Sequence, residues 1–202
     1  MKFDIVTLFG LPWLKKYYQD AGRLCRRCAK HQPSVAIMLG KLRYLIKYLH
    51  FYYMLQIGTP APYFEGYDEN GNRVRLSDFA GKKLVLYFYP KDSTPGCTAE
   101  ACDLRDNYER FIALGYEVLG VSRDSAASHQ RFIAKYELPF HLIADTDLSI
   151  LKAYEAWGKK KMYGKETEGT LRTTYVIDEQ GIIVDAIGKV DTKNHTSQVL
   201  KG

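Results

Sequence analysis

The stretch LVLYFYPKDSTPGCTAEACDL, residues 84–104, decides the fold, because it joins an apolar run to a turn and then to a helix. Leu84–Tyr89 is continuously apolar and aromatic, as expected for a central buried strand. The following PKDSTPG is rich in turn-forming residues. Residues 96–114 then carry apolar side chains at helical spacing. The sequence therefore predicts a strand-to-helix junction with Cys97 in the first helical turn.

On either side of this junction, the sequence predicts alternating strands and helices. The expected strands are Val74–Leu76, Tyr116–Val121, His141–Ala144, Thr173–Ile177 and Ile182–Ile187. The expected helices are Ser125–Tyr136, Asp147–Tyr154 and a last one that begins after Asn194. The last two strands flank DEQG, which is a hairpin signal. This order of elements predicts a three-layer α/β domain.

Length and composition allow one well-buried domain with some length left over. The chain has 202 residues, of which 46% are hydrophobic and 26% charged. Four cysteines in this length do not make a disulfide framework, so reactive, paired or metal-bound thiols are better readings.

The positive charge is confined to the N-terminal quarter. Residues 1–55 hold ten Lys or Arg and two acids, whereas residues 56–202 hold 19 basic and 21 acidic side chains. The larger part is thus nearly neutral and shows no nucleic-acid-binding face. The proline- and glycine-rich QIGTPAP, residues 56–62, marks the boundary between a basic N-terminal extension and a domain over 56–202.

The extension, residues 1–55, is expected to be helical. Leucines and other apolar residues recur at spacings of three and four over 39–53, interrupted by Lys41, Arg43 and Lys47, so a transmembrane helix is not expected. A signal peptide is not expected either. Cys25 and Cys28 form C-R-R-C, which is either a redox or half-metal motif or two incidental cysteines. We favour the second reading, because no further ligand pair exists.

Cys97 is placed where a thiolate is favoured. The unpaired N–H groups and the dipole of a helix N-terminus stabilise an anion, so a lowered thiol pKa is expected. Cys102 follows five residues later. In an ideal helix the two Cα atoms are about 8.6 Å apart, whereas a disulfide needs roughly 4.4–6.8 Å. Either the two thiols are unrelated, or their oxidation unwinds the start of the helix.

Two other roles are open to these cysteines. Cys102 alone could be a small buried hydrophobe. A metal site is not expected, because two cysteines on nearly opposite helix faces do not converge and no histidine lies close in sequence. No C-x-x-C occurs in the domain.

The pattern Pro90-x-x-x-Thr94-x-x-Cys97 resembles the active-site signature of the peroxiredoxins. The longer FYPKDSTPGCTAEACDLRDNY resembles the bacterioferritin comigratory protein, or peroxiredoxin Q, subfamily. Further blocks in the same order support this: LSDFAGKKLVLYFYPKD, VLGVSRDS, LIADTD, WGKKKMYGK and LRTTYVIDEQG. The similarity runs from about Gln56 to near the C-terminus.

The resemblance implies a thioredoxin-like fold, a central mixed β-sheet flanked by helices. It also implies a thioredoxin-dependent peroxidase that reduces hydrogen peroxide and organic hydroperoxides through an intramolecular disulfide, Cys97–Cys102. Cys97 would be the peroxidatic and Cys102 the resolving cysteine. Thr94 would hydrogen-bond the thiolate and the peroxide, Pro90 would shape the pocket, and Arg172 would stabilise the thiolate and polarise the O–O bond.

The subfamily implies no cofactor and no metal, a thioredoxin or similar dithiol as reductant, a monomer, and the bacterial cytoplasm. The extension departs from the subfamily. Met54 opens a stretch that resembles a native start, so an upstream start codon would account for residues 1–53. The alternative function is membrane or partner binding by the basic helix, with the domain as a redox sensor. We do not favour membrane contact.

Overall fold

The computed structural model describes residues 54–162 and 165–201. The predictions made for residues 1–53 lie outside these residues, among them the basic helix, the C-R-R-C motif and the alternative binding function. Within the described part of the chain, no helix is both long and apolar enough to cross a bilayer.

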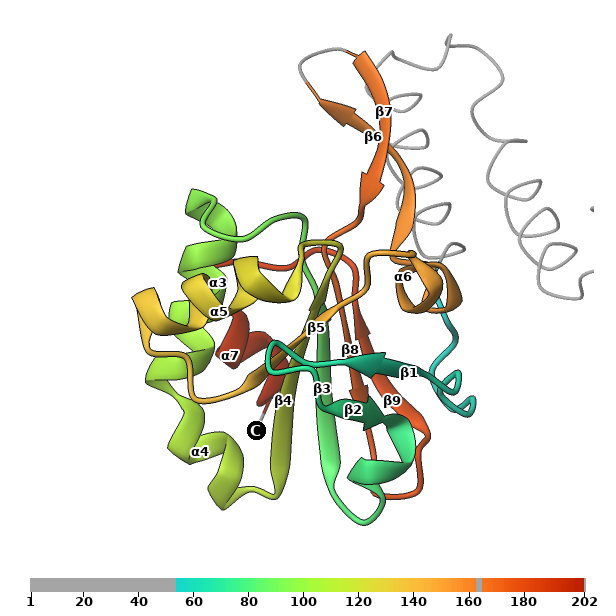
Figure 1. Cartoon of the computed structure of the whole chain (residues 1–202). Coiled ribbons are helices and arrows are strands. Elements are labelled where there is room, and N and C mark those ends of the chain that lie inside the picture. The colour runs from blue at the N-terminus through green and yellow to red at the C-terminus, as the bar shows by residue number, and fades with distance from the viewer. Residues whose placement is uncertain (1–53, 163–164, 202) are drawn as a thin grey trace, which may run out of the picture. The chain divides into compact units, whose positions relative to one another are not determined.

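A five-stranded mixed sheet forms the centre of the domain (Figure 1). Its strand order is β5-β4-β3-β8-β9. β3 pairs in parallel with β4, and β4 with β5, whereas β8 runs antiparallel to β3 and β9 antiparallel to β8. The strands are β3 (Lys83–Phe88), β4 (Tyr116–Ser122), β5 (His141–Ala144), β8 (Thr173–Ile177) and β9 (Ile183–Ile187). All five lie where the sequence predicted strands, to within two residues.

Helices cover both faces of this sheet, so the domain has three layers (Figure 1). The alternation in β3 shows why: Val85 and Tyr87 belong to one core cluster, and Leu84 and Leu86 to the other. The first cluster packs under α3 (Pro95–Asp106), α4 (Tyr108–Ala113), α5 (Ala126–Tyr136) and α7 (His195–Val199), and the second under α6 (Ser149–Ala153). The expected thioredoxin-like α/β fold is confirmed.

The predicted helix over 96–114 is wrong in one respect, because it is two helices. Asn107 lies between α3 and α4 with φ −110° and ψ 11°, outside the helical region, and its side-chain amide donates to the Asp103 carbonyl at 2.8 Å. The side chain thus replaces a backbone donor at the end of α3.

Two strand pairs lie outside the central sheet, and one of their four strands lies where the sequence predicted a strand, at Val74–Leu76. β1 (Glu65–Tyr67) pairs with β2 (Arg73–Arg75), which is followed by the 3₁₀ helix η2 (Leu76–Phe79). β6 (Trp157–Met162) and β7 (Lys165–Thr170) form a hairpin that extends away from the central sheet (Figure 1). Half of the residues in these two strands are charged, and the sequence shows no apolar alternation that would predict them. Opposite charges such as Lys159 and Glu168 face each other across the pair instead.

Candidate active site

The candidate active site begins where β3 ends and α3 starts. Thr94 is the N-cap of α3 in an extended conformation, and Pro95 takes the first helical position, where its missing N–H costs nothing. Cys97 is the third residue of the helix and is only 2% exposed. The thiol therefore lies in the first helical turn, as the sequence predicted.

Arg172 meets Cys97 through the pairing of β3 with β8. The register sets Phe88 opposite Thr173, so the residue before β8 lies beside the end of β3 from which the chain continues to α3. Arg172 Nη2 donates to Cys97 Sγ at 3.1 Å. Burial alone would lower the pKa of Arg172, but Glu100 and Cys97 outweigh it and raise that pKa above its usual value. A fixed cation thus faces the sulfur.

Glu100 is a second partner of Arg172 that sequence reasoning missed. Its carboxylate accepts a hydrogen bond from Arg172 Nη1, and its side chain is fully buried. Burial raises the pKa of Glu100 to about 7, and Arg172 opposes that rise. The available signal was the spacing, because a residue three positions after Cys97 shares its helix face.

His195 also belongs to this buried group and was not predicted. Its Nδ1 lies 3.3 Å from Glu100 Oε1, and its Nε2 lies 2.9 Å from Thr174 Oγ1. Burial, followed by the charge of Arg172, lowers the pKa of His195 to about 4. No local sequence signal connects residue 195 to a helix almost a hundred residues earlier.

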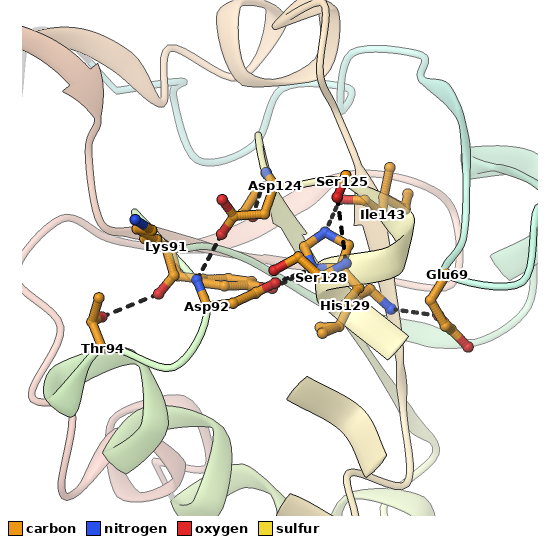
Figure 2. A network of polar contacts seen from close by, with 12 residues as sticks. Glu69, Lys91, Asp92, Thr94, Asp124, Ser125, Ser128, His129 and Ile143 are labelled. Atoms are coloured by element: carbon orange, nitrogen blue, oxygen red, sulfur yellow. Dashed lines mark hydrogen bonds and ion pairs between the residues drawn. The ribbon is translucent and has the colours of Figure 1, made fainter. Parts of the chain in front are cut away.

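Thr94 and Pro90 lie on the chain between β3 and α3, and both are half-buried. The Thr94 hydroxyl donates to the Lys91 carbonyl at 3.1 Å and makes no capping bond with the helix (Figure 2). The hydrogen bond expected from Thr94 to the thiolate is therefore absent here. The hydroxyl would have to rotate away from Lys91 to make it.

The loop between β3 and α3 is anchored by Asp92, which is 7% exposed. Asp92 Oδ2 lies 2.9 Å from His129 Nδ1 on α5, and the Tyr89 hydroxyl donates to Asp92 Oδ1 at 2.8 Å. The Asp92 backbone N–H donates to Asp124 Oδ2 at 2.6 Å (Figure 2). His129 Nε2 faces the Ile143 carbonyl at 3.2 Å. Both nitrogens of this buried ring thus face oxygen atoms, which fixes the ring between the loop and β5.

Cys102 lies on the same helix as Cys97. It is half-buried, both thiols are free, and α3 runs unbroken from Pro95 to Asp106. The two cysteines are thus placed in an intact helix, where their spacing is too long for a disulfide.

Asp68, Glu69 and His141 form the one group of three metal-type side chains found among the described residues. Its carboxylate oxygens already accept N–H donors from the turn and from β5: Asn70 and Asn72 donate to Asp68, and Asn70, His141 and Leu142 donate to Glu69. These bonds close the turn after β1, and we assign no metal to the cluster.

A buried cysteine at a helix N-terminus, facing an arginine on a thioredoxin-like sheet, defines a thiolate-based redox protein. The model of the AhpC/TSA family matches residues 57–186. The chain belongs to this family and is a peroxiredoxin, an oxidoreductase of the peroxidase class.

Two similar relatives indicate which type of peroxiredoxin the chain is. The chain is 44% identical over 147 residues to the peroxiredoxin Bcp of Bacillus subtilis, covering 73% of this chain and 94% of the relative. It is 40% identical over 146 residues to the peroxiredoxin Bcp of Escherichia coli, covering 72% and 94%.

A solved structure agrees. Peroxiredoxin Q of Xanthomonas campestris superposes with a TM-score of 0.65 at 40% identity, over 68% of this chain and 87% of that chain. These relatives confirm the expected bacterioferritin comigratory protein, or peroxiredoxin Q, type.

Proposed function

We propose that the protein is a thioredoxin-dependent peroxidase that reduces hydrogen peroxide and alkyl hydroperoxides, with Cys97 as its nucleophile. The observation that carries this proposal is the 3.1 Å contact between Arg172 Nη2 and Cys97 Sγ. A permanent cation beside a thiol at a helix N-terminus favours the thiolate, which is the nucleophilic form. A related Xanthomonas campestris structure is described by its alkyl peroxide reduction activity.

In the first step, the Cys97 thiolate attacks the terminal oxygen of the peroxide. An S–O bond forms while the O–O bond breaks, and the leaving oxygen takes a proton and departs as water or an alcohol. Arg172 stabilises the charge that develops on the breaking bond. We assign to Pro90 the shaping of the peroxide pocket, and to the Thr94 hydroxyl a hydrogen bond to the peroxide once it leaves the Lys91 carbonyl. Cys97 is left as a sulfenic acid.

In the second step, Cys102 attacks the Cys97 sulfur. An S–S bond forms, and the sulfenic oxygen leaves as water with the proton of Cys102. Because both cysteines lie in an intact α3, this step requires the first turns of the helix to unwind. A dithiol such as thioredoxin then reduces the Cys97–Cys102 disulfide and is itself oxidised.

The test is peroxide consumption coupled to NADPH through thioredoxin and thioredoxin reductase. We expect Cys97→Ser to abolish turnover, and Cys102→Ser to complete one turnover without forming the 97–102 disulfide. If Cys97→Ser kept the wild-type rate, the proposed function would be wrong. A disulfide between Cys97 and Cys25 would instead reassign the resolving cysteine.

The proposal extends to the setting of the enzyme. We propose a monomer in the bacterial cytoplasm, with residues 56–202 as the catalytic domain and residues 1–55 as an accessory extension. The nearly neutral charge of the domain and its match to bacterial peroxiredoxins over most of their length support this setting.

A further inference from the structure

Two buried polar atoms face each other beneath Arg172 and are not used by the proposed mechanism. Glu100 Oε1 and His195 Nδ1 are 3.3 Å apart, and both side chains are fully buried. Neither atom has another hydrogen-bond partner among the described residues. Buried polar atoms without partners are costly, so their juxtaposition indicates that each serves the other.

His195 is held in this place by the backbone bond of its neighbour and by a contact of its ring. It is the first residue of α7, and the next residue, Thr196, fixes α7 to α3 by donating its N–H to Asp103 Oδ2 at 2.7 Å. The far nitrogen of the ring, Nε2, lies 2.9 Å from Thr174 Oγ1 in β8. A continuous series of polar contacts therefore runs from α7 through Glu100 and Arg172 to the Cys97 sulfur.

The charges around the pair define how its protons are arranged. The charged and titratable groups that act on Glu100 are Arg172, just before β8, Asp103 on its own helix, and Tyr87 on β3. Burial and Arg172 lower the pKa of His195 to about 4, so its ring is neutral at neutral pH and carries one N–H. When the Thr174 hydroxyl donates to Nε2, that proton sits on Nδ1 and points at Glu100 Oε1.

We propose that His195 is a positioning residue for the Cys97 thiolate. It holds one oxygen of Glu100, so that the other oxygen stays on Arg172 and the guanidinium stays on Cys97 Sγ. Without a donor at Oε1, the carboxylate has an unsatisfied oxygen in a dry interior and turns away or takes a proton. Arg172 then loses the partner that orients it.

Two substitutions separate this role from simple packing. In His195→Asn the side-chain amide nitrogen takes the place of Nδ1, and in His195→Gln it takes the place of Nε2. We expect His195→Asn to retain the reactivity of Cys97. We expect His195→Gln, which keeps only the contact to Thr174, to lower it about ten-fold at pH 7 and to move the pH midpoint of the reaction upward.

The readout is the rate of Cys97 alkylation by iodoacetamide as a function of pH, in full-length protein carrying Cys102→Ser. The tryptic peptide 92–105 then holds one thiol, which mass spectrometry follows separately from Cys25 and Cys28. Val199→Ala is the matched control, because it loosens the packing of α7 without touching Glu100. It should leave the alkylation profile unchanged.

The proposal is overturned if His195→Asn loses as much reactivity as His195→Gln, if neither changes the profile, or if the midpoint moves downward. Although this inference rests on the proposed role of Cys97, alkylation needs no peroxide and no reductant. A failed peroxidase assay with an intact alkylation profile would refute the proposed function alone. If the protein is an active peroxidase but its His195 variants do not show the expected alkylation profiles, only the positioning role is refuted.

Discussion

Among the single residues of the site, Arg172 shares one guanidinium between two acidic groups. Its Nη2 faces the Cys97 sulfur and its Nη1 binds Glu100, so the geometry uses the planar fork of arginine and not only its charge. Lysine has a single ammonium nitrogen, so it cannot place one nitrogen on each of the two groups.

We therefore expect Arg172→Met to reduce kcat/KM for hydrogen peroxide by about 10²–10³-fold, the range typical of losing a donor to developing charge. Arg172→Lys should fall between this variant and the wild type, because it restores charge without the fork. Stopped-flow measurement of sulfenic acid formation checks both. A lysine variant as fast as the wild type would show that charge alone is needed.

Glu100 and His195 contribute in opposite directions to the pH dependence of stability. The pKa of Glu100 rises from 4.5 to about 7 on folding, so its contribution to stability falls as the pH rises through that window. The pKa of His195 drops from 6.5 to about 4, so its contribution rises with pH between those values. The two slopes oppose each other and largely cancel in the wild type.

Single substitutions should reveal separately how each residue makes the free energy of unfolding depend on pH. In Glu100→Gln the free energy of unfolding should rise with pH between about 4 and 6.5, by about 1 kcal/mol per pH unit. In His195→Asn it should fall between about 4.5 and 7. Urea unfolding at a series of pH values measures both. Parallel curves for the two variants would contradict the opposed shifts.

At the scale of elements, α3 has to be both rigid and able to open. The helix holds Cys97 against Arg172 in the reduced protein, yet its regular geometry keeps Cys102 too far away for a bridge. The loop that leads into it carries Ser93 at φ 56°, a left-handed conformation that a non-glycine residue adopts at some cost.

Oxidation should therefore unwind the start of α3. Amide hydrogen exchange of residues 97–102 should become faster after one equivalent of peroxide, as the disulfide forms. Cys102→Ser provides the control, since it reaches the sulfenic acid without closing the bridge and should stay protected. Unchanged protection in a protein whose mass proves the 97–102 disulfide would contradict this expectation.

The loop before α3 is anchored from the opposite side by α5. Burial alone would raise the pKa of Asp92, but the hydrogen bond and charge of His129, with help from Ser128 and Tyr89, lower it below its usual value. The stability that this carboxylate adds is present above about pH 4 and is lost as the pH falls through the lower folded-state pKa.

Asp92→Asn should destabilise the domain by about 3 kcal/mol at pH 7, the cost of breaking a buried pair by removing one partner. The asparagine amide has only one oxygen, so either the Tyr89 hydroxyl or the His129 ring nitrogen loses its acceptor. Chemical denaturation at pH 7 and at pH 3 tests this, and the difference from the wild type should shrink at the lower pH. A difference that grew on acidification would refute the anchoring role.

For the whole molecule, the described domain contains both of its hydrophobic cores. The two core clusters on the faces of the sheet are built from residues 61–200, and the family match covers residues 57–186. A domain with its own cores is expected to fold alone.

A truncated protein that begins at Met54 should therefore keep the thermal midpoint and the peroxide reduction rate of the full chain within error. The measurement is paired calorimetry and coupled assay. Co-sedimentation with anionic vesicles, run on both proteins, tests residues 1–53 separately. If truncation abolished turnover, the extension would be part of the enzyme.

The sequence by itself determined where the strands of the central sheet lie along the chain and where β3 passes into α3, because apolar periodicity and turn residues are local properties of the chain. The family followed from its motifs. It also named Cys97 and Arg172, through the resemblance. It did not find the break at Asn107 or the charged hairpin of β6 and β7, where no apolar pattern exists.

Tertiary structure alone decided what surrounds the thiol. The register of β3 with β8 places Arg172 on Cys97, and the docking of α7 on α3 brings His195 to Glu100. Such contacts join side chains that lie 75 to 95 residues apart, and no local pattern encodes their distance or burial. The pKa values of Glu100 and His195 follow from that burial, since removing water penalises charge only once the chain has folded around them.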